Sequence, residues 1–138
     1  MQLYAYLTFD GDCEEAMRHY ADVLRGQIVA MQPHEGTPAA DYVPPDWRSK
    51  ILHARLHIGD AVLMASDSPP GMQEKMQGIS VALVIEDPDE AERIFNAFAE
   101  DGVVTMPLSE TFWAKKFGML TDRFGTPWMI NCEKPMAA

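Results

Sequence analysis

The sequence predicts an α+β fold of two tandem βαβββ modules, which together form one curved, open mixed sheet with a cleft. Three observations indicate this architecture. A strand, an acidic turn and a helix start occur twice, with Glu15-Ala16 and Glu90-Ala91 lying 75 residues apart, and such a period is typical of duplicated supersecondary units. Both helix starts carry capping signals. Each helix is followed by three strand-like runs.

The first module opens with an alternating strand in which one face carries Tyr4, Tyr6 and Thr8 and the other carries Ala5, Leu7 and Phe9. A helix is expected to begin at Asp12, with Glu15 three residues on, and to end at Gly26. Its expected buried stripe is Cys13, Met17, Tyr20 and Leu24. Strands follow over Gln27–Gln32, Ile51–Ile58 and Ala61–Ser66, and the proline-containing segment His34–Lys50 forms a long loop, a candidate lid.

The second module repeats this order. Its first strand alternates Ser80, Ala82 and Val84 with Val81, Leu83 and Ile85. Asp87 is a suitable N-cap, Pro88 suits the first helical position and Glu90 completes a capping box. The apolar helix face is Ala91, Ile94, Phe95 and Phe98, and Gly102 ends the helix. Strands are expected over Val103–Leu108, Thr111–Thr121 and Pro127–Cys132.

We therefore expect residues 1–138 to be a single domain of two modules, about 1–67 and 78–135, joined by a linker over 68–77. Gly59-Asp60 predicts a tight hairpin turn, which places Ile58 opposite Ala61 and Arg55 opposite Met64. One face is then apolar and packs under the helices: Leu52, Ala54, Leu56, Ile58, Leu63 and Ala65. The other face is either solvated or the wall of a polar cavity: His53, Arg55, His57, Val62, Met64 and Ser66. On the last strand, Pro127, Met129 and Asn131 oppose Trp128, Ile130 and Cys132.

The formal net charge of −10 disfavours nucleic acid and anionic membranes as partners, because both need clustered Lys and Arg. It permits a cationic ligand, although acidity also serves solubility. No apolar run approaches the roughly 20 residues of a membrane helix, and no signal-peptide pattern opens the chain. Cys13 and Cys132 belong to no metal-binding or redox motif. We expect both to be reduced, packed thiols in a cytoplasmic protein.

Five segments together resemble the vicinal oxygen chelate superfamily of glyoxalases, extradiol dioxygenases and bleomycin-resistance proteins, and within it the PhnB-like branch. They are Tyr6–Cys13, Ile51–Ala54, Leu63–Asp67, Thr111-Phe112-Trp113 and Thr121–Asn131. The resemblance spans nearly the whole chain and implies the paired βαβββ fold. Members of the branch are often described as 3-demethylubiquinone methyltransferase-like. The Gly-rich loop by which common methyltransferases hold S-adenosylmethionine is absent from this sequence.

The resemblance also implies where a divalent metal would bind, namely near Tyr4 (or Ala5), Met64, Ser80 and Met129. Divalent cations prefer carboxylate and imidazole ligands, so this set predicts no metal there and no cofactor. His53 and His57 lie on one strand, roughly 13 Å apart by strand rise, too far to share an ion. We expect His57 to be exposed, and Arg55 to pair with either a ligand anion or a nearby carboxylate.

The leading functional hypothesis is a homodimeric PhnB-like protein that binds a small organic molecule in a metal-free cleft, with no catalytic residue predicted. The expected ligand-binding residues are Tyr4, Tyr6, His53, Arg55, Met64, Ser66, Phe112, Trp113, Met129 and Asn131. Trp113 either contacts the ligand or packs at a dimer interface. The alternatives are a metal-dependent lyase or isomerase of glyoxalase type, and a protein that sequesters a cationic antibiotic. Whether the chain is an enzyme stays open.

Overall fold

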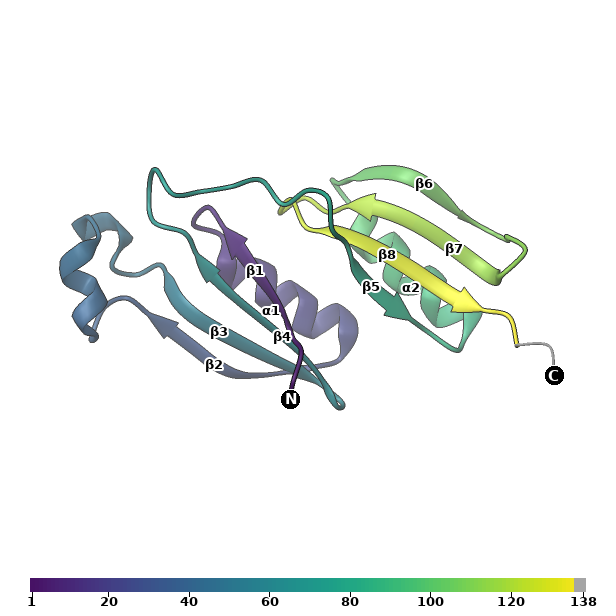
Figure 1. Ribbon diagram of the computed structural model, residues 1–138, viewed down its shortest axis with the longest axis horizontal. Coiled ribbons are helices and arrows are strands. Elements are labelled where there is room, and N and C mark those ends of the chain that lie inside the picture. Colours follow the sequence, from purple (N-terminus) through teal and green to yellow (C-terminus); the bar gives the residue numbers. More distant parts are fainter. Residues whose placement is uncertain (136–138) are drawn as a thin grey trace. The chain divides into compact units, whose positions relative to one another are not determined.

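The computed structural model describes residues 1–135 and shows an α+β fold of two βαβββ modules (Figure 1). The chain divides into two compact units, with the boundary between Lys75 and Met76, inside the expected linker 68–77. The part of the chain up to Lys75 is called the first module, and the part from Met76 is called the second module.

The first module contains one helix and four strands: β1 (Ala5–Phe9), α1 (Cys13–Leu24), β2 (Gln27–Pro33), β3 (Ile51–Ile58) and β4 (Ala61–Asp67). The strand order is β1-β4-β3-β2. β1 runs parallel to β4, whereas β3 is antiparallel to both β4 and β2. The sheet is therefore mixed, and α1 covers one of its faces (Figure 1).

The second module repeats the pattern with β5 (Val81–Val84), α2 (Pro88–Ala99), β6 (Val103–Ser109), β7 (Ala114–Thr121) and β8 (Pro127–Glu133). Its order is β5-β8-β7-β6, again with one parallel pair, β5 and β8. Both helices have 12 residues, and they begin at Cys13 and Pro88. The predicted repeat is thus confirmed, including its offset of 75 residues.

Three features differ from the expectation. The strands form two four-stranded sheets rather than one, because each described ladder pairs strands of a single module. β7 begins at Ala114, not Thr111, because Thr111 and Ala114 close a tight turn through their backbones and the Thr111 hydroxyl. The loop 34–50 contains two short 3₁₀ helices, Pro38–Tyr42 and Pro45–Trp47. Its base is held by buried His34, whose backbone N–H donates to the Lys50 carbonyl.

The two helices differ in how their ends are capped. The Asp87 carboxylate accepts from the Asp89 N–H, as predicted. Asp12 makes no such side-chain bond, and the first N–H of α1, that of Cys13, donates to the Asp67 carboxylate. Arg25 rather than Gly26 adopts the left-handed conformation after α1. Gly26 is needed for close packing, since a Cβ there would lie 2.7 Å from the His57 carbonyl oxygen.

Each helix packs its apolar face on its own sheet. In α1 the buried residues are Cys13, Ala16, Met17, Tyr20 and Val23, so Val23 replaces the expected Leu24, which is half-buried. In α2 they are Ala91, Ile94, Phe95 and Phe98, as predicted. Trp128 is fully buried and stacks on Phe98 with 4.4 Å between ring centroids. The predicted hairpin register, Ile58 opposite Ala61 and Arg55 opposite Met64, is confirmed.

Each module contains a buried carboxylate that accepts three hydrogen bonds. Asp67 accepts three backbone N–H bonds of 2.9 Å, from Gly11 and Cys13 on one oxygen and from Ile51 on the other. Its position at the end of β4 by itself suggests only a cap on the turn that follows. Asp122 accepts from the N–H groups of Phe124 and Thr126 and from the indole of Trp128. Asp67 thus joins chain segments that are far apart in the sequence, whereas Asp122 holds the turn between β7 and β8.

Cys13 and Cys132 are free and buried, as expected of packed thiols. Within residues 1–135, neither α1 nor α2 has the length and apolar character that crossing a membrane requires.

Candidate functional site

The first sheet has one face that α1 does not cover, called here the helix-free face. The opposite side packs Leu7, Phe9, Leu56 and Leu63 into the core. Strand alternation and register place twelve residues on the helix-free face: Tyr4, Tyr6, Thr8, Gln27, Ala30, Gln32, His53, Arg55, His57, Val62, Met64 and Ser66. The helix-free face therefore contains all six ligand-binding residues that were predicted in the first module: Tyr4, Tyr6, His53, Arg55, Met64 and Ser66.

Arg55 lies at the centre of a contact group on this face. Its Nε donates to Nε2 of His57 at 2.9 Å, and Nη2 is 3.5 Å from the hydroxyl of Tyr4. The guanidinium carbon lies 5.2 Å from the centroid of the Tyr4 ring, a cation–π arrangement. The predicted exposure of His57 is wrong: it is half-buried because Arg55 lies against it.

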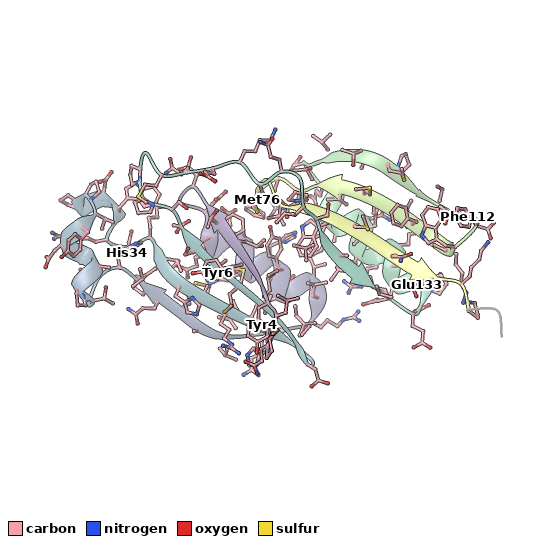
Figure 2. The ribbon with its side chains drawn as sticks, in the orientation of Figure 1. Tyr4, Tyr6, His34, Met76, Phe112 and Glu133 are labelled. Atoms are coloured by element: carbon pink, nitrogen blue, oxygen red, sulfur yellow. The ribbon has the colours of Figure 1, made fainter. Side chains whose placement is uncertain are left out.

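Tyr6 and His53 form a second contact pair on the same face. Their rings stack with centroids 6.0 Å apart, and the Tyr6 hydroxyl lies 3.4 Å from Nδ1 of His53. Tyr6 is 47% exposed, so this pair presents an aromatic surface to solvent. Figure 2 labels Tyr4, which directly precedes β1, and Tyr6, which lies within β1. Met64 and Ser66, both half-buried, lie on β4 beside Tyr6 and Thr8 in the register.

Among the twelve residues of the helix-free face none is Asp, Glu or Lys. The carboxylate partner considered for Arg55 is not found, since none of the ion pairs in residues 1–135 involves Arg55. This distribution is notable in a chain with a net charge of −10. The acidic groups that dominate the protein lie elsewhere.

The four predicted residues of the second module are Phe112, Trp113, Met129 and Asn131. Phe112, Trp113 and Phe117 contact one another edge to face, with centroids 4.7 and 5.2 Å apart. Phe112 is 89% exposed at the turn before β7 (Figure 2). Asn131 lies opposite Phe117, and Met129 lies opposite Met119. The Asn131 amide donates weakly to Glu133, while its oxygen is buried without a hydrogen-bond partner among the described residues.

The residues at the metal positions that the resemblance implied do not fit a divalent ion. They offer a phenol, a hydroxyl and two thioethers, and divalent ions favour carboxylates and imidazoles. Tyr4 also lies against the Arg55 guanidinium, a cation that would repel a metal ion. Within residues 1–135, no three or more His, Cys, Asp or Glu side chains cluster as a metal site would require.

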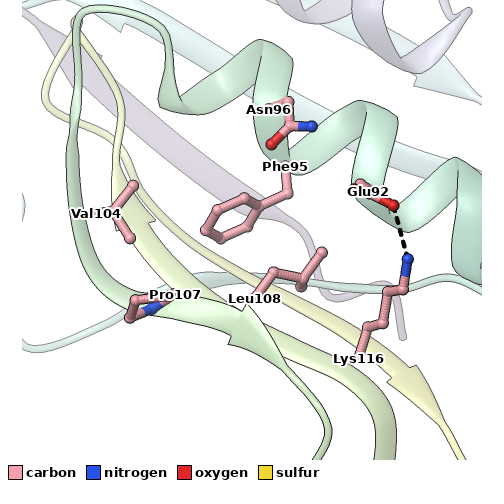
Figure 3. A pocket seen from close by; sticks show the side chains of 7 residues that line it. All are labelled: Glu92, Phe95, Asn96, Val104, Pro107, Leu108 and Lys116. Atoms are coloured by element: carbon pink, nitrogen blue, oxygen red, sulfur yellow. Dashed lines mark hydrogen bonds and ion pairs between the residues drawn. The ribbon is translucent and has the colours of Figure 1, made fainter.

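A hollow of about 410 Å³ lies between α2 and strands β6 and β7 (Figure 3). Its lining is Glu92, Phe95, Asn96, Val104, Pro107, Leu108 and Lys116. The two charged groups bond to each other at 2.7 Å, which lowers the pKa of Glu92 and raises that of Lys116. Each of these charges is therefore paired with the other.

A second hollow, of about 570 Å³, lies at the start of α1 and is mostly acidic. Its basic groups are engaged, since Arg18 pairs with Glu14 at 2.8 Å and Lys50 donates to the Gly11 carbonyl at 2.8 Å. Burial, the largest cause, raises the pKa of Asp12.

Sequence reasoning did not find either hollow or the bond between Arg55 and His57. Alternation put both side chains on one face, but two residues separated by one position on a strand are about 7 Å apart by strand rise. The long Arg side chain closes that gap. The sequence did contain one relevant signal, since no Asp or Glu is among the residues predicted to share a face with Arg55.

Comparison with known proteins agrees with this architecture. A family model described as 3-demethylubiquinone-9 3-methyltransferase matches residues 1–131. Protein YjdN of Escherichia coli (strain K12) is 33% identical over an alignment of 144 residues. The alignment covers 97% of this chain and 97% of that protein.

Solved structures give the same result. The crystal structure of protein PA1353 from Pseudomonas aeruginosa is similar at 48% identity, with a TM-score of 0.89 over 98% of this chain and 99% of that one. A putative 3-demethylubiquinone-9 3-methyltransferase, PhnB protein, from Bacillus cereus has 26% identity and a TM-score of 0.81, covering 95% and 98%. A glyoxylase/bleomycin resistance protein/dioxygenase domain from Frankia sp. EAN1pec has 11% identity and a TM-score of 0.68, covering 97% and 98%, which shows the fold alone. The chain therefore belongs to the PhnB-like family, whose model is described as 3-demethylubiquinone-9 3-methyltransferase, and has a glyoxalase-like fold.

Proposed function

We propose that this protein binds a small organic molecule against the helix-free face of its first sheet, without a metal ion. The observation that carries the proposal is the pair of contact groups there, Tyr4–Arg55–His57 and Tyr6–His53. Ligand sites combine aromatic or apolar surface with a few placed polar groups. The face offers two tyrosine rings, two imidazoles and an Arg side chain without a carboxylate partner among the described residues.

Three other activities find less support. Common methyltransferases hold S-adenosylmethionine in a doubly wound parallel sheet, whereas each sheet here has a single parallel pair. A cationic antibiotic would need acidic contacts, and the helix-free face has no acid. A glyoxalase-type lyase needs a metal or a suitable base, and the residues at the implied metal positions lack the ligands for one. We therefore propose binding and assign no reaction.

We also propose that the protein is a homodimer. The strand orders leave β1 and β2 at the edges of the first sheet, and β5 and β6 at the edges of the second. The unpaired N–H and C=O groups of an edge strand are a template on which a strand of another chain can pair. Light scattering after size exclusion should give twice the chain mass of 15.5 kDa. A mass of one chain at micromolar concentration would overturn this part.

The binding proposal is tested by a fragment screen with saturation-transfer NMR, repeated on two tyrosine variants. Tyr6→Ala removes an aromatic ring from the helix-free face. Tyr42→Ala removes one that is 86% exposed in the 3₁₀ segment of the loop, and serves as the matched control. We expect Tyr6→Ala to weaken the leading fragments about tenfold, because burying a ring contributes about 1–2 kcal/mol. Equal binding by both variants would overturn the proposed location.

A further inference from the structure

We infer that the group recognised on the helix-free face is an oxyanion, a carboxylate or phosphate, held by the two terminal nitrogens of Arg55 with the Tyr4 hydroxyl beside them. This inference rests on the proposed function and adds the chemical class of the ligand. It is drawn from the donors of Arg55, the charges around it and the contacts that fix its side chain.

Most of the hydrogen-bonding capacity of Arg55 is unused. A guanidinium has five N–H donors in a planar fork. Within the described residues, one is used by His57 at 2.9 Å, and one approaches Tyr4 at the long distance of 3.5 Å. The remaining donors lie at the Nη end, the edge of the fork that matches two carboxylate or phosphate oxygens.

The surroundings favour an anion at this position. Arg55 is half-buried, and neither Asp nor Glu is among the twelve residues of the helix-free face. A partly buried cation attracts an anion more strongly than a fully solvated one, because less water screens the pair. Elsewhere Arg18 and Arg93 each have a carboxylate within 2.8 Å. Arg55 differs from them in lacking this partner.

The guanidinium is also preorganised. The Tyr4 ring lies 5.2 Å from its carbon, and His57 holds its Nε. Because Arg has no acceptor, Nε2 of His57 must be the acceptor of this bond, so the imidazole carries its proton on Nδ1 and is uncharged in this arrangement. Contacts from both sides reduce the side-chain freedom that would be lost when a ligand binds.

The test is a set of amide chemical-shift titrations of the ¹⁵N-labelled protein with three probes. Benzoate and phenyl phosphate carry the two oxyanions, and benzamide is the neutral counterpart of benzoate. Arg55→Gln removes the cation and leaves a shorter, neutral polar side chain. Arg18→Gln is the matched control, because Arg18 lies on α1, at the covered side of the sheet. Arg55→Lys keeps the charge without the planar fork.

We expect at least one oxyanion probe to bind ten- to hundredfold more tightly than benzamide, with shifts in β1, β3 and β4, since charged hydrogen bonds give differences of this order. Arg55→Gln should abolish the difference, Arg55→Lys should keep part of it and Arg18→Gln should keep it all. The relative affinities of benzoate and phenyl phosphate identify the preferred oxyanion.

If all three probes bind this face equally, and equally in Arg55→Gln, the oxyanion inference is overturned while the proposed function stands. If none of them shifts residues of this face, both fail. Should Arg55→Gln prove unfolded by circular dichroism, the comparison of benzoate with benzamide on the unmodified protein and on Arg55→Lys still decides between these outcomes.

Discussion

Replacing Asp67 by Asn should destabilise the first module more than any other isosteric change to a polar side chain within it. The carboxylate is 3% exposed and accepts from three backbone N–H groups, all at 2.9 Å. An amide keeps one acceptor oxygen, so either Ile51 or the pair Gly11 and Cys13 loses its acceptor. The amide NH₂ then faces a backbone N–H, and two donors oppose each other.

The magnitude follows from these contacts. Losing one hydrogen bond to a charged acceptor costs about 1.5–3 kcal/mol, and leaving a buried donor unpaired adds about 1–3 kcal/mol. The lower cost of burying a neutral amide offsets part of this. We expect a net loss of about 3 kcal/mol in the free energy of unfolding, a large share of the roughly 5–15 kcal/mol of a typical domain.

Urea unfolding followed by circular dichroism measures the loss, and amide hydrogen exchange locates it at Gly11, Cys13 and Ile51. Asp60→Asn, at the exposed hairpin turn, is the matched control and should change stability by less than about 0.5 kcal/mol. A loss below about 1 kcal/mol for Asp67→Asn, with unchanged exchange at the three amides, would refute the reasoning.

Three further predictions concern the second carboxylate, a close-packed glycine and a buried thiol. Asp122→Asn should cost about 2–3 kcal/mol and alter the fluorescence of Trp128, whose indole donates to that carboxylate at 2.8 Å; unchanged fluorescence and urea midpoint would contradict this. Gly118→Ala should cost about 1–3 kcal/mol in urea unfolding, because a Cβ would lie 2.6 Å from the Phe95 ring, and a neutral effect would show that the ring moves freely. Burial, helped by nearby carboxylates, raises the pKa of the Cys13 thiol above its ordinary 9.0. The unfolded chain therefore releases this proton first, and the free energy of unfolding should fall above pH 9 by up to about 1.4 kcal/mol per pH unit. Cys13→Ala should lack that component, and an equal slope in both proteins would count against it.

The parts of the fold that local patterns specify could be predicted from the sequence. Gly59 and Asp60 set a two-residue hairpin, and alternation then assigned residues 52–58 of β3 and 62–66 of β4 to a face. Asp87 and Pro88 set the start of α2 within the same few residues that form it. Both predictions needed only neighbours in the chain.

The missed features depend on distant residues. Asp67 bonds to Gly11 and Cys13, which lie 56 and 54 positions away, so its position after a strand suggested only a local cap. In the candidate site, the strand pattern placed Tyr4, Arg55 and His57 on one face, but their contacts depend on rotamers that sequence patterns do not encode.

Two crystal structures, one of the protein with phenyl phosphate and one of the protein with benzoate, test the central claim most directly. The account predicts that in at least one of them an oxyanion lies 2.7–3.2 Å from the Nη atoms of Arg55, with the ring against the helix-free face. An oxyanion bound elsewhere in both crystals, or a carboxylate of a second protein copy in contact with Arg55, would contradict the claim that this face binds a small acidic molecule.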